Sequence, residues 1–452
     1  MDVLQNNKPA THLQGWLNLS HWGNNLLLLY IITMPFVSAF AFTNIISLPL
    51  IFAVFLLALM IIETLRNGKL PKGFAGFDLI IVCLFLFLDI FSYAVNGWGV
   101  VKSLNHTVAY LATFFLFYIP VKFTLFNAKD NAQLFKKVLQ FVTYTTIISA
   151  LYANVEFISS NVFRINLNDY IPRPSEEQAY YDATVLGIFY RARGFTAESG
   201  HFTFMMELFS PVAIYYMYFS GFCKWWKLSK AFIIFTIICS FIFAVSTASF
   251  VIVPIAVFLA GMLRMKTIFI YLKKRTAKFL FTSAIVAAIV FLFNYFLSVY
   301  ALILLSINDK MNNGYDYRQQ NINFFFTKFF RLDVIKQLIG AGPAGVLILG
   351  YDQSTAILNL YYSIAFELGF LGFFLLLALL FYVTIKIIKI NSSISFFLLI
   401  SFFSGAMHYY FIANFWYPWF WFIMVFAIFC SKKFSPPSLN LKPAIKNSRR
   451  PR

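Results

Sequence analysis

The sequence is poor in charge, since 12% of its 452 residues are Asp, Glu, Lys or Arg whereas 60% are hydrophobic. Soluble globular domains carry about 25% charged residues, so this composition excludes a soluble globular fold. Acidic residues are scarcer than basic ones, since there are 17 Asp and Glu against 36 Lys and Arg, which leaves a net charge of +19. The basic residues form short clusters between apolar runs, which is typical of polytopic membrane proteins and argues against nucleic-acid binding.

Cysteine is also rare, with four residues in the chain. Cys83 and Cys239 lie inside apolar runs, whereas Cys223 and Cys430 lie beside basic residues at the ends of runs. No pair has the spacing of metal ligands, so neither a disulfide framework nor a zinc site is expected. The amino terminus lacks the pattern of a cleavable signal peptide, because no small-residue cleavage site follows the first apolar run near Leu26.

Long apolar runs are abundant. A transmembrane helix needs about 20 apolar residues, and the chain offers about twelve such runs. They predict membrane spans at 25–42, 44–63, 77–95, 106–122, 138–158, 202–220, 229–246, 248–263, 281–303, 369–388, 393–409 and 412–430. We therefore expect an all-α polytopic membrane protein with about twelve transmembrane helices.

The basic clusters predict the orientation in the membrane. Alternate connections, together with Lys8 and the carboxy-terminal tail, carry most of the 36 Lys and Arg residues. Cytoplasmic loops are enriched in these residues, so both termini are predicted to be cytoplasmic. The external side then holds two long loops, at about 159–201 and 304–368. Residues 1–430 would form a single transmembrane domain with these loops, and the basic residues 431–452 a disordered cytoplasmic tail.

The late external loop changes character along its length. It starts polar, alternates apolar and basic residues from Phe324 to Leu338, and continues through the glycine-rich segment Gly340–Gly345. The alternating part predicts an amphipathic helix. Long loops in a compact protein are usually functional or disordered, and the short connections elsewhere favour a functional role here.

The early external loop ends in a dense group of charged residues, just before an apolar run. Arg191 and Arg193 would lie at headgroup depth, where arginine binds phosphate through a planar, bidentate fork. Gly194 permits close backbone approach, and a helix that starts near Ser199 or Gly200 would add free amide groups to an anion site. The alternative is that both arginines extend to lipid headgroups.

Two further groups are candidates for proton transfer. Glu198 lies five residues after Arg193 and is a candidate either for a general base or for holding the arginine in place. His201 has a suitable pKa, but a single histidine at the mouth of a span is more often structural. Arg318 in the late loop is a second arginine candidate, with a solvated loop charge as the alternative.

Ionisable residues inside the apolar runs form a separate set. Asp89 and Glu207 lie within predicted spans, where carboxylates usually face a polar interior or a functional cavity. A structural partner such as an arginine is as good an explanation as substrate contact. His106 and His408 are weaker candidates. With no glycine-rich nucleotide loop and no metal-ligand pattern, we expect no cofactor and no metal.

An ordered series of short motifs runs through residues 191–372. The series consists of Arg193-Gly194-Phe195-Thr196-Ala197-Glu198, Arg318, Gly340-Ala341-Gly342, Asn359-Leu360-Tyr361-Tyr362 and Glu367-Leu368-Gly369-Phe370-Leu371-Gly372. It resembles the O-antigen polymerase (Wzy-type) and O-antigen ligase superfamily, whose late loop carries Arg, Gly-x-Gly, His-Asn-x-Tyr and Glu-x-Gly-x-x-Gly in this order. Each motif alone is weak, and their order on one side of the membrane is the more specific feature.

The sequence departs from the ligases at one position. Leu358 stands where the ligases carry a histidine before the asparagine. The role proposed for that histidine therefore does not transfer, which favours a polymerase. The resemblance implies that Arg193 and Arg318 handle a pyrophosphate and that Asn359, Tyr361 and Glu367 contribute to substrate binding.

The resemblance also implies a reaction. The protein would be an inverting, metal-independent glycosyltransferase at the periplasmic face of the bacterial inner membrane. It would transfer a glycan from undecaprenyl pyrophosphate to a lipid-linked repeat unit, with membrane lipids and a chain-length regulator protein as partners. The alternatives are an O-antigen ligase that passes glycan to lipid A-core and, from another class, a twelve-span transporter or a flippase.

Overall fold

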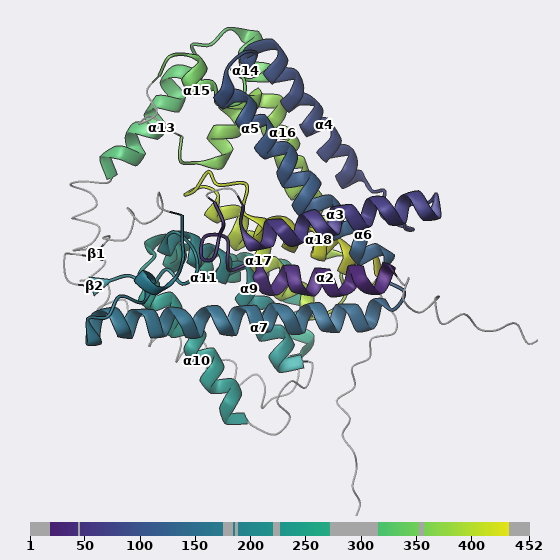
Figure 1. Ribbon diagram of the computed structural model, residues 1–452, viewed down its shortest axis with the longest axis vertical. Helices are drawn as coiled ribbons and strands as arrows, with labels where there is room; N and C mark the ends of the chain where they lie inside the picture. The colour runs from purple at the N-terminus through teal and green to yellow at the C-terminus, as the bar shows by residue number, and fades with distance from the viewer. Residues whose placement is uncertain are drawn as a thin grey trace, which may run out of the picture.

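The computed structural model describes residues 19–43, 46–174, 184–185, 189–219, 227–271, 315–351 and 357–433 (Figure 1). The fold is all-α. Its α-helices are α2 (Leu19–Thr33), α3 (Leu48–Asn67), α4 (Phe77–Ser92), α5 (Val101–Ala112), α6 (Ile119–Asn127), α7 (Asn131–Ile158), α9 (Ser199–Phe219), α10 (Lys227–Ala244), α11 (Thr247–Tyr271), α13 (Tyr315–Phe329), α14 (Val334–Ile339), α15 (Gly345–Ile348), α16 (Leu360–Ile388), α17 (Ile394–His408) and α18 (Pro418–Lys433).

Short irregular elements extend or join these helices. They are the π-helical turns η1 (Tyr93–Gly97), η2 (Thr113–Tyr118) and η3 (Ser159–Phe163), the 3-10 turn η4 (Leu167–Tyr170), and the two-residue strands β1 (Thr184–Val185) and β2 (Phe189–Tyr190). The strands pair antiparallel, with Thr184 opposite Tyr190. The turn η3 continues α7 directly, and β2, which leads into the charged segment Arg191–Glu198, contacts η3 at that end of the helix (Figure 1).

Within the described residues, six helical segments are long and apolar enough to cross a membrane. These segments are Leu48–Asn67, Phe77–Gly97, Val101–Asn127, Asn131–Phe163, Thr247–Arg264 and Leu360–Ile388. Three shorter apolar helices accompany them, at Lys230–Ala244, Ile394–His408 and Pro418–Lys432. The chain is thus an α-helical membrane protein.

Every predicted span that falls within the described residues overlaps a helix, whereas the predicted span at 281–303 and the predicted tail beyond residue 433 lie outside them. Several predicted boundaries were wrong: α16 begins at Leu360 rather than 369, and α18 begins at Pro418 rather than 412. The helix predicted at 25–42 begins earlier and ends at Thr33, before Pro35, since proline cannot continue a helix. The single amphipathic helix predicted from Phe324 to Leu338 is broken into α13 and α14, because the Asp333 side chain caps a new helix by accepting from the Lys336 N–H.

The core is organised around α18, whose residues from Trp419 to Cys430 are all buried. Helix α16 packs against α18 and against α4, while α9 lies between α7 and α17. In Figure 1, α7 runs beside α2, and α4, α5 and α16 lead away from this layer to the tip formed by α13, α14 and α15.

A glycine kink divides α16. Gly369 has φ +69° inside the helix, and a Cβ there would lie 2.3 Å from the carbonyl oxygen of Leu338. The kink leaves carbonyl groups of the preceding turn free, and the amides of Ala341 and Gly342 donate to Phe366 O at 2.9 Å and Glu367 O at 3.1 Å. The Gly-x-Gly motif and the Glu-x-Gly motif are therefore two halves of one contact.

Two ionic contacts lie away from this kink. Lys122 on α6 donates to the Asp78 carboxylate on α4, and Tyr118 Oη donates to the same oxygen at 2.8 Å. Arg264 on α11 donates to the carbonyl oxygens of three residues at the end of α16, namely Ile387, Ile388 and Ile390. Both contacts give buried polar groups the hydrogen-bond partners that lipid could not provide.

The close contact between the Gly340–Gly342 segment and α16 predicts that position 340 requires a residue without a side chain. A Cβ at Gly340, which has φ +90°, would lie 1.9 Å from Glu367 O, so Gly340→Ala must displace backbone. We expect a loss of about 3 kcal/mol in the free energy of unfolding, seen as a lower midpoint of thermal unfolding in detergent. Gly261→Ala on α11 is the control, because its Cβ would meet nothing within 4 Å; equal midpoints for the two variants would contradict the packing described here.

Candidate functional site

The segment Arg191–Glu198 is held in place from several elements of the fold. The Ala192 N–H donates to Phe243 O on α10 at 3.0 Å, and the Ala39 N–H donates to Phe195 O at 3.0 Å. The ring of Phe195 stacks on Tyr152 of α7, with centroids 4.2 Å apart. The segment is thus a fixed, largely buried part of the protein.

A buried carboxylate on α7 organises the segment. Glu156 Oε2 accepts the backbone N–H of Arg193 at 3.0 Å and that of Gly194 at 2.8 Å. Its other oxygen accepts from Asn168 Nδ2 at 2.7 Å and lies 3.9 Å from Arg193 Nε. A carboxylate buried in a membrane protein is costly unless it is paired and hydrogen-bonded, and Glu156 meets both conditions.

Arg173 fastens the other side of the same turn. Its guanidinium donates to Thr196 O, to Gly194 O at 2.8 Å and to Asn168 Oδ1 at 3.2 Å. The side chain is buried, and its use here is structural. Gly194 has φ +60°, and a Cβ at this position would lie 2.7 Å from the Phe202 ring, so the turn requires glycine.

Arg191 and Arg193 line two neighbouring cavities. The larger, of about 440 Å³, is also lined by Glu198, His201 and the first turn of α9. The smaller, of about 210 Å³, lies against the end of α7 and includes Arg164. The larger one combines two guanidinium groups with the start of a long helix, and both features favour an anion.

The start of α9 at Ser199 agrees with the predicted helix start. His201 in its first turn is buried, with Nδ1 at 3.0 Å from Tyr417 Oη and Nε2 at 3.3 Å from Asn414 Nδ2. Glu198 is exposed at the edge of the large cavity. Burial lowers the pKa of the Arg191 guanidinium, and the charge of Glu198 opposes that effect. Arginine remains charged under such shifts.

A third cavity, of about 330 Å³, adjoins the large one. It is lined by Lys102, His106, Glu367 and Trp416, and it shares Leu358, Ala413 and Asn414 with the large cavity. The predicted site residue Glu367 is therefore separated from the arginines by this shared wall. Leu358 forms part of the wall.

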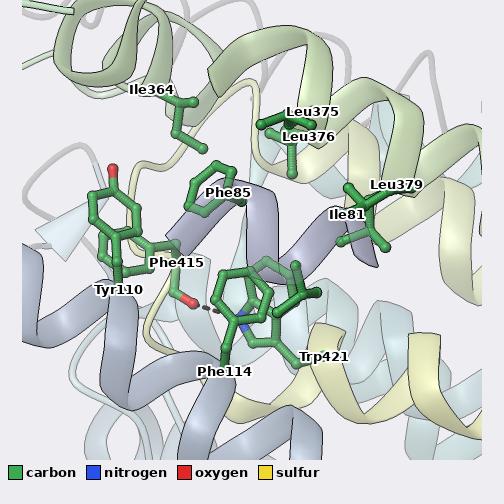
Figure 2. A pocket seen from close by; sticks show the side chains of 11 residues that line it. Ile81, Phe85, Tyr110, Phe114, Ile364, Leu375, Leu376, Leu379, Phe415 and Trp421 are labelled. Carbon is green, nitrogen blue, oxygen red and sulfur yellow. Dashed lines mark hydrogen bonds between the residues drawn. The ribbon is translucent and has the colours of Figure 1, made fainter. Parts of the chain in front are cut away.

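The apolar floor below Glu367 is tightly packed. Tyr110 stacks on Phe415 with ring centroids 4.0 Å apart, and Phe114 and Trp421 close the other side (Figure 2). The space left between these side chains is about 10 Å³, which is no more than one water needs. Tyr110 therefore has a fixed position from which its hydroxyl reaches Glu367 Oε2 at 3.0 Å.

Two of the predicted substrate-binding residues have structural contacts. The Asn359 side-chain oxygen caps α16 by accepting the N–H groups of Tyr361 at 2.9 Å and Tyr362 at 3.2 Å. Tyr361 Oη donates to Ala406 O at 2.5 Å. Their contact with substrate stays a prediction. Arg318 lies on α13, but its side chain is outside what the structure describes, so its predicted pairing with Arg193 also stays a prediction.

Of the two carboxylates predicted inside spans, Glu207 pairs with a histidine rather than with the arginine that was considered. Glu207 Oε2 lies 2.9 Å from His408 Nδ1, and both side chains are buried. Glu367 Oε1 lies 3.2 Å from His106 Nδ1, close to the buried Asp89. Among the described side chains, no group of three His, Cys, Asp or Glu residues is arranged to hold a metal ion.

Sequence reasoning did not identify Glu156, Asn168 or Arg173 as parts of the site. For Glu156 a signal was present, because the argument that singled out Asp89 and Glu207 as carboxylates within apolar spans applies equally to it. Asn168 and Arg173 carried no such signal, since both occur in a polar loop where similar residues are common.

The contacts of Glu156 predict that its negative charge stabilises the site. In Glu156→Gln one oxygen remains to accept from the backbone, but the second becomes an amide donor that faces Asn168 Nδ2 and Arg193. We expect a loss of about 2 kcal/mol in stability, measured by thermal unfolding in detergent. Glu63→Gln, at a half-buried glutamate near the end of α3, is the matched control. An unchanged midpoint in Glu156→Gln would show that the carboxylate does not hold the turn.

The sequence was also compared with known proteins. No protein-family model and no curated protein matches the chain. The function is therefore inferred from the residues of the site and from their geometry.

Proposed function

We propose that the protein is an inverting glycosyltransferase that polymerises undecaprenyl-pyrophosphate-linked repeat units into a surface polysaccharide of the O-antigen type. The observation that carries the proposal is the large cavity. It brings Arg191, Arg193 and the start of α9 together at one end of the helical bundle, and it adjoins a second cavity of similar size. A polymerase needs such a pair of sites, because both of its substrates are lipid-linked glycans.

The proposed orientation follows from the charge distribution. About twelve spans with both termini in the cytoplasm would place the connection that carries Arg193 and the connection that precedes α16 on the periplasmic side of the inner membrane. The end of α7, the start of α9 and the start of α16 lie at the cavities, which supports a common side for these three connections. A chain-length regulator would be a partner at the same membrane face.

The arginines would stabilise the leaving group. As the bond between the anomeric carbon and the phosphate oxygen breaks, negative charge grows on the pyrophosphate, and fixed guanidinium groups bind this state more strongly than the ground state. Arg193 is fixed by Glu156 and by its own hydrogen bond to Ala197 O at 3.1 Å, so little reorganisation is needed. A preorganised donor of this kind contributes about 3–4 kcal/mol. Arg318 is proposed as a second contributor from the late loop.

The acceptor hydroxyl must lose a proton in the reaction. Glu198, proposed from the sequence, lies at the edge of the large cavity beside Arg191. Its negative charge also offsets the positive charge of Arg191 before the pyrophosphate binds. The role of Glu198 as a base and its role as a counter-charge to Arg191 can be separated, because only the base must contact the acceptor hydroxyl.

The ligase remains the second candidate within the same chemistry. Leu358 in the wall between the cavities argues against it, since a leucine cannot take the role of the ligase histidine. A transporter or flippase of twelve spans would be expected to show inverted repeats around a midplane site, and the cavities lined by charged residues lie instead at one end of the helices.

Deletion of the gene followed by complementation tests the proposal. A deletion strain should carry a single repeat unit on its lipopolysaccharide, whereas loss of a ligase would leave none. Wild-type protein should restore the ladder. Accumulation of intermediates at the cytoplasmic face would instead indicate a flippase, and uptake of a small solute by purified protein without glycan transfer would indicate a transporter.

Arg193 variants test the site itself. Arg193→Lys keeps the charge but loses the planar fork, and we expect a fall in polymerisation of about 100-fold or more, read as the loss of long chains in the ladder. Membrane levels should remain near those of wild type, because backbone groups rather than the guanidinium make the main contacts of Glu156. Normal chain lengths in this variant would refute the assignment of Arg193 to the pyrophosphate.

A further inference from the structure

The third cavity contains a histidine–carboxylate pair. His106 Nδ1 on α5 lies 3.2 Å from Glu367 Oε1 on α16, and the His106 side chain is 41% exposed while that of Glu367 is 7% exposed. This arrangement leaves the outer edge of the imidazole toward the cavity. A carboxylate at this distance favours the neutral tautomer with its proton on Nδ1, and that tautomer presents Nε2 as a proton acceptor, as a general base requires.

Glu367 is fixed on all sides. Its second oxygen accepts from Tyr110 Oη at 3.0 Å, and its backbone carbonyl accepts from Ser92 Oγ at 3.1 Å and from the Gly342 N–H at 3.1 Å. Tyr110 is itself held by the aromatic floor (Figure 2). The kink at Gly369 and the Gly-x-Gly segment therefore also serve to set the position of one carboxylate.

The same cavity offers the features of a sugar site. Trp416 lines it with an indole that is 44% exposed, and indole faces pack well against the apolar faces of sugar rings. Lys102 and Ser363 add groups that can hydrogen-bond to hydroxyls. With a volume of about 330 Å³, the cavity has room for a small part of a glycan.

We propose that this cavity binds the acceptor repeat unit and that His106 is the general base for its attacking hydroxyl, with Glu367 as a positioning residue. The inference rests on the proposed function. In the reaction, His106 Nε2 takes the hydroxyl proton as the hydroxyl oxygen forms a bond to the anomeric carbon of the donor. The bond from that carbon to the pyrophosphate oxygen breaks, its electron pair leaves with undecaprenyl pyrophosphate, and the imidazolium later releases its proton to water.

The positions of the two cavities support His106 over Glu198 as the base. An inverting displacement requires attack from the face opposite the leaving group. Arg191 and Arg193 place the leaving group in the large cavity, and Glu198 lines that same cavity beside them. His106 lies in the adjoining cavity, across the wall formed by Leu358, Ala413 and Asn414.

Kinetics of the purified protein in lipid vesicles test the inference, with lipid-linked repeat units extracted from the deletion strain as substrate. We expect His106→Ala to lower turnover by about 10²–10⁴-fold and to bind undecaprenyl pyrophosphate as wild type does, whereas Arg193→Ala loses that binding. Added imidazole should restore part of the turnover of His106→Ala and none of that of Arg193→Ala. His21→Ala is the matched control, since His21 is exposed on α2, next to the end of α6.

A double variant tests the role of Glu367. Glu367→Gln should lower turnover about tenfold or more without changing the binding of undecaprenyl pyrophosphate, and the double variant with His106→Ala should be no slower than His106→Ala alone, because residues that act as one unit are not additive. A merely structural Glu367 would give additive losses.

Other outcomes would overturn the inference. Turnover near that of wild type in His106→Ala, with loss confined to Glu198→Gln and Arg193→Ala, would move the base to the arginine cavity and leave the proposed function intact. Wild-type protein that joins no repeat units would refute both the proposed function and the role of His106.

Discussion

The site depends on one buried carboxylate. Glu156 accepts two consecutive backbone N–H groups, from Arg193 and Gly194, and so fixes the direction in which the following side chains leave the chain. Because it lies in a helix that belongs to the membrane layer, its position is set by the packing of α7 against α2, α9 and α10. The guanidinium groups are thereby placed by the hydrophobic core, although they themselves face polar cavities. Without an acceptor oxygen at this point, the backbone N–H groups of Arg193 and Gly194 would be buried donors with no acceptor.

The charged groups that line the large cavity and the third cavity form two centres. The cationic centre belongs to the turn between β2 and α9, and the centre with Glu367 and His106 belongs to α5 and α16. Leu358, Ala413 and Asn414 lie between them. This separation suits a reaction in which an anion leaves from one side of a carbon while a proton is removed on the other. It also keeps Glu367 away from the anion that the cationic centre is proposed to bind.

The apolar runs were sufficient to predict the helices, because burial in lipid is a property of local composition. The break between α13 and α14 was also readable, since Asp333 is a typical capping residue. What could not be read were contacts between distant segments. The amides that Glu156 binds lie 37 and 38 residues away. The cap made by Asn359 is by contrast local, and asparagine is a typical capping residue, so it was as readable as Asp333. His106 was undervalued because its contact is distant, since a single histidine acquires meaning only when Glu367, on another helix, lies beside it.

The pairing of Asp78 with Lys122 has a consequence for how the chain enters the membrane. Both side chains are fully buried, and neither ion can leave water alone without a cost of several kcal/mol. The two residues are 44 positions apart, so α4 is synthesised well before its partner α6. Until α6 arrives, Asp78 lacks its cationic partner and must remain at the aqueous edge of the membrane. Assembly of this helix pair is therefore a delayed, joint step rather than the independent insertion of two spans.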